Sequence, residues 1–104
     1  MINWNAIGTL FALVHSVTTV SKDTDVDITK SILVGKRLYT VECKAAISDT
    51  AIPDTPIVDY SPLHLIANLF LMIEGISEGM STFVHSYKMS TDEYINVTIS
   101  VTEK

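Results

Sequence analysis

Alternation of apolar and polar residues is clearest near the end of the chain. Ile95, Val97, Ile99 and Val101 are separated from one another by single polar residues. A period of two residues places the four apolar side chains on one face of an extended segment and the polar ones on the other. The pattern therefore predicts a half-buried strand that begins near Tyr94.

Two earlier segments have strand character and form a predicted hairpin. Val26–Val34 is the first strand, Arg37–Ile47 is its partner, and Gly35-Lys36 makes the tight turn between them. One face of this hairpin is expected to carry Leu33, Tyr39, Val41, Cys43, Ala45 and Ile47. The other face is expected to carry Lys36, Thr40, Glu42 and Lys44.

Helical spacing of apolar residues marks the start of the chain. Asn3 or Asn5 is a suitable cap for a helix that runs to about Val17, although the β-branched run from Val17 to Val20 is also compatible with a strand. The inward face of this helix holds Trp4, Ile7, Leu10, Phe11, Val14 and Val17. The opposite face holds Gly8, Thr9, Ala12, His15, Ser16 and Thr19, and it has no formal charge.

A second helix is predicted after a loop at residues 48–61. Ser61 is a suitable cap, Pro62 suits the first helical position, and the apolar spacing continues to about Tyr87. The order is then helix–strand–strand–helix–strand. We expect an α+β fold in one domain, residues 1–104, with a small, mostly antiparallel three-stranded sheet packed against two helices.

Composition narrows the classes of function. The chain has 104 residues, of which 47% are hydrophobic and only 18% are charged, and its net charge is −5. The acidic balance disfavours nucleic-acid binding, and no apolar run is long enough for a transmembrane helix. The single cysteine, Cys43, excludes an intrachain disulfide, is expected to be buried and inert, and favours a cytoplasmic location.

Motifs that resemble catalytic or metal sites do not assemble into one. Gly75–Gly79 matches the G-x-S-x-G pattern around Ser77, but it falls within helical periodicity, where the required sharp turn is absent. Asp23–Asp27 begins like a calcium loop and lacks the glycine and glutamate that should follow. His64 and His85 would lie about 31 Å apart along one helix, which is too far for both to bind one metal ion. We therefore expect no catalytic residues, no metal and no cofactor, and a protein that is not an enzyme.

Small residues at helical spacing indicate a close approach between backbones. Gly75 and Gly79 are expected on one side of the second helix, and Gly8, Ala12 and Ser16 recur in the first. The close approach is either between the two helices of one chain or between two copies of the chain, and a kink or a ligand is a further alternative. The predicted interface residues are Gly8, Ala12, Ser16, Asn68, Leu71, Met72, Gly75, Gly79 and Thr82.

Four of the seven basic residues lie in the hairpin segment. Lys30, Lys36, Arg37 and Lys44 are predicted to form a small site for a phosphate-bearing ligand, whereas a solvated sheet face is the simpler interpretation. The leading hypothesis is a non-enzymatic, homo-oligomeric interaction protein that acts as an inhibitor, adaptor or assembly subunit. The partner would be a second copy, with another protein or a phosphate-bearing ligand as alternatives. An acidic surface that competes for a nucleic-acid-binding protein is the weakest hypothesis.

Overall fold

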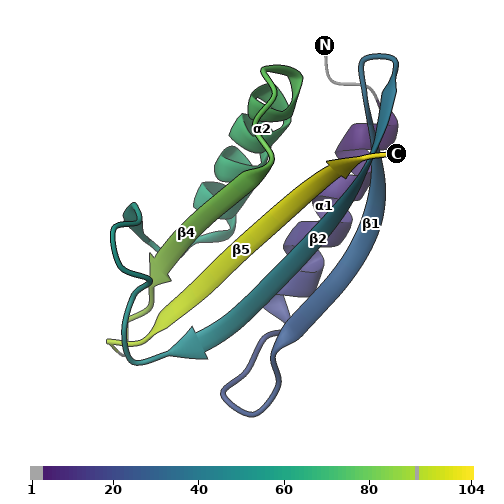
Figure 1. The fold of residues 1–104 in the computed structure, drawn as a ribbon. Helices are drawn as coiled ribbons and strands as arrows, with labels where there is room; N and C mark the ends of the chain where they lie inside the picture. Colours follow the sequence, from purple (N-terminus) through teal and green to yellow (C-terminus); the bar gives the residue numbers. More distant parts are fainter. Residues whose placement is uncertain (1–3, 91) are drawn as a thin grey trace.

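A twisted five-stranded sheet forms one layer of the fold, and two helices form the other (Figure 1). The computed structural model describes residues 4–90 and 92–104, so the predicted cap Asn3 lies outside the described residues. The elements in chain order are α1 (Trp4–Thr18), β1 (Val26–Val34), β2 (Arg37–Ser48), β3 (Ile57–Asp59), α2 (Pro62–Ser77), β4 (Thr82–Lys88) and β5 (Tyr94–Glu103). The α+β class and the three predicted strands are confirmed.

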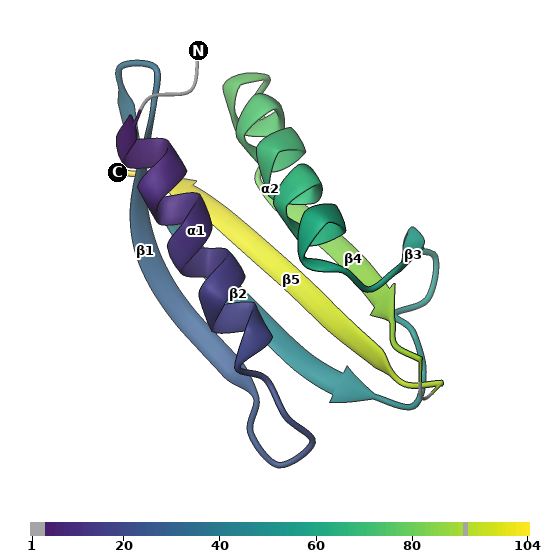
Figure 2. The same cartoon turned by 180° about the vertical axis from the view of Figure 1, so that it is seen from behind.

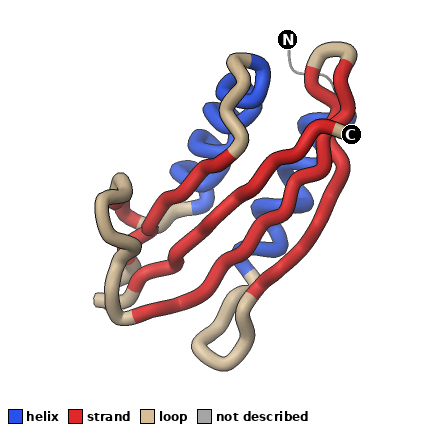
Figure 3. Tube along the Cα trace, in the orientation of Figure 1, coloured by secondary structure: helices blue, strands red, loops and turns tan. Residues whose placement is uncertain are grey.

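The sheet has the strand order β1-β2-β5-β4-β3 (Figure 3). β1 and β2 form the predicted antiparallel hairpin, with Val34 opposite Arg37 and Gly35 at a φ of 63° in the turn. β5 lies between β2 and β4 and is antiparallel to both. β3 is the exception, because its three residues run parallel to the end of β4.

The predicted three-stranded sheet and the long second helix are wrong. α2 ends at Ser77, and the segment from Thr82 to Lys88 is strand β4 rather than helix. Glu78 caps the helix and Gly79 follows at a φ of 93°, while the N–H groups of Gly79 and Met80 donate to the carbonyls of Ile76 and Gly75. This is a Schellman motif, in which a left-handed glycine ends a helix. The apolar spacing beyond Gly79 matched a helix by coincidence.

Both helices cover the same face of the sheet (Figure 2), and the core lies between the two layers. α1 lies over β1 and beside α2. α2 lies over β4, where Gly75 approaches Phe83. Ser61 caps α2 as predicted, since its Oγ accepts the N–H of His64 at 3.1 Å, and Pro62 begins the helix. Neither helix in the described chain is long and apolar enough to cross a membrane.

The strand register decides which side chains face the helices. Partners in register share a face, so Val41, Cys43, Val97, Ile99 and Val101 face the helices together. Residues of opposite parity form the other face, which neither helix covers. Leu33 pairs with Leu38 on this uncovered face, so its predicted position beside Val41 and Cys43 is wrong.

Candidate functional site

The outward surface of α2 is unusually apolar. Leu63 is 77% exposed and Leu71 is 61% exposed, while Ala67 between them is also exposed. Glu74 is the only acidic or basic side chain in Pro62–Ser77 other than His64. An ordinary surface helix carries charged residues on its solvent side, so this surface differs from the usual pattern.

The outward surface of α1 continues the uncharged character. Phe11 is 54% exposed, Gly8 and His15 are exposed, and Trp4–Thr18 contains no Asp, Glu, Lys or Arg. When the histidines are neutral, Glu74 is thus the only formal charge on α1 and α2. We call this surface, formed by the exposed parts of α1 and α2, the helix face.

The predicted interface residues of the second helix lie in four different environments. Gly75 is buried, and a Cβ atom built there would lie 2.8 Å from Cε1 of Phe83. Met72 is buried in the core, and the Asn68 side chain donates a hydrogen bond to the hydroxyl of Tyr87 at 2.8 Å. These three residues pack α2 against β4 and the core of the same chain.

The other predicted interface residues do not lie together. Gly79 lies in the turn after α2, Thr82 lies on the uncovered face of β4, and only Leu71 presents its side chain on the helix face. On α1, no atom lies within 4 Å of a Cβ built on Gly8, and Ser16 donates a hydrogen bond to the carbonyl of Ala12. Gly8 and Gly75 therefore do not contact each other.

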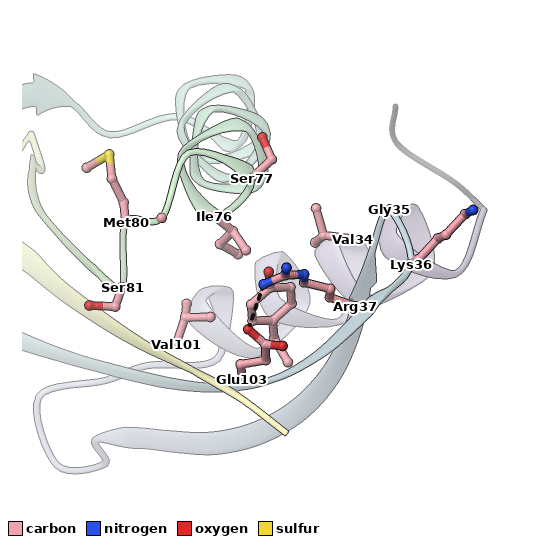
Figure 4. A pocket seen from close by; sticks show the side chains of 12 residues that line it. Val34, Gly35, Lys36, Arg37, Ile76, Ser77, Met80, Ser81, Val101 and Glu103 are labelled. Carbon is pink, nitrogen blue, oxygen red and sulfur yellow. Dashed lines mark hydrogen bonds and ion pairs between the residues drawn. The ribbon is translucent and has the colours of Figure 1, made fainter.

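The four hairpin cations are dispersed. Lys30 is in register with Val41 on the helix side of the sheet, whereas Lys44 is in register with Asp27 on the uncovered side. Lys36 and Arg37 lie at the hairpin turn, where they line a cavity of about 590 Å³ between the hairpin and the end of α2 (Figure 4). The structure brings together only these two cations.

This cavity combines an apolar floor with a polar rim. Val34, Tyr39, Ile76 and Val101 contribute the apolar part. At the rim, Nη1 of Arg37 lies 3.2 Å from Oε1 of Glu103, and both side chains are largely solvated (Figure 4). A solvated ion pair of this kind contributes little stability, so an anion that competes with Glu103 for Arg37 would displace a weak contact.

The residues considered for catalysis or metal binding are held in hydrogen bonds within the fold, buried, or far from one another. The hydroxyl of Ser77 donates to the carbonyl of Glu74 at 2.7 Å within the last turn of α2, and His85 lies in β4 rather than on the same helix as His64. Burial raises the pKa of the Cys43 thiol to about 11, with a smaller contribution from Asp27. Among residues 4–90 and 92–104, no three His, Cys, Asp or Glu side chains are grouped so that they could hold a metal ion.

A polar cluster around the buried side chain of Ser86 was not predicted from the sequence. The hydroxyl of Ser86 donates to Oδ1 of Asn96 at 2.7 Å and accepts the N–H of Ile52 at 3.0 Å, while Nδ2 of Asn96 donates to the carbonyl of Thr50. The Thr55 hydroxyl closes the loop by donating to the Ile52 carbonyl. These bonds hold residues 49–56 against one end of the uncovered face. Alternation along each strand gives a residue's face but not the loop that covers it.

Comparison of the chain with protein-family models, curated proteins and solved structures gave no match.

Proposed function

We propose that this protein acts by binding, as a homo-oligomeric interaction protein of the inhibitor, adaptor or assembly-subunit kind, and that it is not an enzyme. The observation that carries the proposal is the exposure of Leu63 and Leu71 on a helix whose outward surface has one formal charge. Exposed apolar surface is costly in water, at roughly 25 cal/mol per Å². A partner that covers the helix face removes this cost.

Charge favours a second copy of the chain as that partner. The net charge is −5, so two copies repel each other over most orientations. A two-fold interface joins the same patch on both subunits, which places like charges close together wherever the patch is charged. The helix face, with Glu74 as its only formal charge, avoids this repulsion.

Molar mass from light scattering after gel filtration tests the proposal with one pair of variants. Leu71→Lys places a charge on the helix face and should yield a folded monomer, because substitution of an exposed side chain changes the free energy of unfolding by only about 0.5 kcal/mol. Thr29→Lys adds the same charge on the uncovered face of β1 and should leave the oligomer intact. A wild-type protein that is already monomeric would exclude this function.

A second candidate function is the binding of a small phosphate-bearing ligand at the hairpin cavity. The supporting observation is the proximity of Lys36 and Arg37 to an apolar floor in a cavity of about 590 Å³, a volume within the range of small-molecule sites. ATP is a suitable probe, and binding should raise the melting temperature. Arg37→Gln should remove the increase, and Lys44→Gln should not. Equal increases in both variants would locate the ligand elsewhere.

A reducing cytoplasm is the compartment that we propose. Cys43 is buried within the core, and the chain has no second cysteine with which it could form an intrachain disulfide. Such cysteine usage is typical of proteins in reducing compartments.

A further inference from the structure

One half of strand β4 forms an open edge of the sheet. The N–H of Val101 donates to the carbonyl of Ser81, so residues of odd number in this segment direct their backbone groups toward β5. Residues of even number direct theirs away from β5. At Ser86 and Lys88 these groups bond to the chain around β3, through Pro56 and Tyr60.

The outward backbone groups of Thr82 and Val84 have no such neighbour. β3 pairs with β4 only at residues 86–88, and within the described chain no other strand lies beside Thr82–His85. Open strand edges are templates for another strand, and proteins usually protect them with charges, prolines, bulges or covering segments. Charges and prolines are absent here, because residues 79–87 contain no Asp, Glu, Lys, Arg or Pro.

The opposite edge of the same sheet is protected. On β1, the Thr9 hydroxyl from α1 donates to the outward carbonyl of Ser31 at 3.1 Å, and Lys104 donates to the Ser31 hydroxyl. Asp27 and Lys30 add charges along this strand. The contrast between the edges indicates that β4 is the one left free for pairing.

We propose that a second copy of the chain pairs its own β4 antiparallel to this edge, through the N–H and C=O groups of Thr82 and Val84. This inference rests on the proposed function and specifies the surface involved. Two-fold symmetry makes identical edge strands antiparallel, and the absence of charge in residues 79–87 lets each copy face itself without repulsion. The two sheets then become one continuous sheet.

The α2 part of the helix face supplies the side-chain part of the same contact, whereas α1 lies over β1 at the far side of the sheet and stays outside it. α2 lies over β4 (Figure 2), so strand pairing brings α2 of each copy to the same side of the joined sheet, next to the other. Leu71 in α2 is 61% exposed, and Met80 in the connection to β4 is 52% exposed. We expect the contact to bury both side chains and so to add an apolar contribution to the strand pairing.

Val84→Pro tests the strand pairing. Proline removes the outward N–H of Val84 and leaves the bonds between β4 and β5 in place, because proline is tolerated at an edge. We expect the dissociation constant of the oligomer to rise about tenfold or more. Thr29→Pro is the matched control. The carbonyl of Ser31 points away from β2, so the N–H of Thr29, two residues earlier on β1, also points away from β2, at the opposite edge of the sheet. This substitution should leave the dissociation constant unchanged.

Amide hydrogen exchange of the wild-type protein decides the question even where Val84→Pro does not fold. The amides of Thr82 and Val84 should exchange slowly in the oligomer and rapidly in monomeric Leu71→Lys, while the Thr29 amide exchanges rapidly in both. An oligomer that persists in Val84→Pro, or whose Thr82 and Val84 amides exchange as fast as Thr29, overturns strand pairing and leaves the proposed function standing. A monomeric wild type overturns both.

Discussion

A Cβ atom on Gly75 would lie 2.8 Å from Cε1 of the Phe83 ring, so α2 approaches β4 closely at this position. Real Cβ atoms do not approach another heavy atom so closely, and the ring would have to move. Phe83 itself packs against the core. The glycine that sequence spacing assigned to a contact between helices thus serves a contact between a helix and a strand of the same chain.

Gly75→Ala should destabilise the protein despite the higher helix propensity of alanine. Overpacking in a core costs about 1–3 kcal/mol, whereas the propensity gain is at most about 1 kcal/mol. The expected net loss, measured by urea unfolding, is about 1 kcal/mol. Gly8→Ala is the control, because no atom lies within 4 Å of the added methyl group, and it should stabilise α1. Equal effects of the two substitutions would contradict the packing described.

Gly79→Ala should lower the free energy of unfolding through backbone strain alone. Gly79 has a φ of 93° and no atom within 4 Å of an added Cβ, so conformation is the only difference. A left-handed conformation costs roughly 1–2 kcal/mol for a residue with a side chain. Gly79→Asn should cost less in the same chemical unfolding experiment, since asparagine tolerates this region better. A stability increase in Gly79→Ala would show that α2 continues past Ser77.

Ser86→Ala should loosen residues 49–56. The substitution leaves Oδ1 of Asn96 and the N–H of Ile52 without the hydroxyl that joins them, and each buried unpaired group costs about 1–3 kcal/mol. We expect faster hydrogen exchange of the Ile52 amide and a loss of about 1–3 kcal/mol in the free energy of unfolding. Ser100→Ala, at an exposed position on the same sheet face, should change neither. Unchanged exchange at Ile52 would exclude the role given to Ser86.

Alkaline pH should reduce stability through Cys43. Burial raises the pKa of this thiol from 9.0 to about 11 in the folded state, so the folded chain holds the proton more tightly than the unfolded chain does. The resulting stability is present below pH 9 and is lost as the pH rises toward 11. Between pH 9 and 10 the wild type should lose about 1 kcal/mol more than Cys43→Ala. Parallel losses in urea unfolding would contradict the burial of the thiol.

Strands with strict alternation were predictable from the sequence, and one boundary was not. β1, β2 and β5 have a period of two, and the turn at Gly35 follows from residue type. β4 was missed because Ile76, Met80 and Phe83 also fit helical spacing, and the stop signal at Gly79 was interpreted as a packing residue. β3 has only three residues, which is too short for a period of two to be recognised.

The candidate surfaces were predictable only in part. Absence of charge on α1 and the exposure of Leu71 follow from residue type and helical spacing. Spacing could not separate Lys30 from Lys44, because the register of the hairpin puts them on opposite faces. The open edge of β4 depends on where β3 begins, and that is a property of the tertiary structure.

Sedimentation equilibrium of the wild-type protein tests the central claim most directly. A concentration of about 100 μM is suitable, because the weakest interfaces of standard size have dissociation constants in the micromolar range. The chain has a mass of 11.5 kDa. Association through the helix face predicts a dimer of about 23 kDa, or a larger whole multiple, that reverts to the chain mass in Leu71→Lys. A single species of 11.5 kDa at every concentration would contradict it.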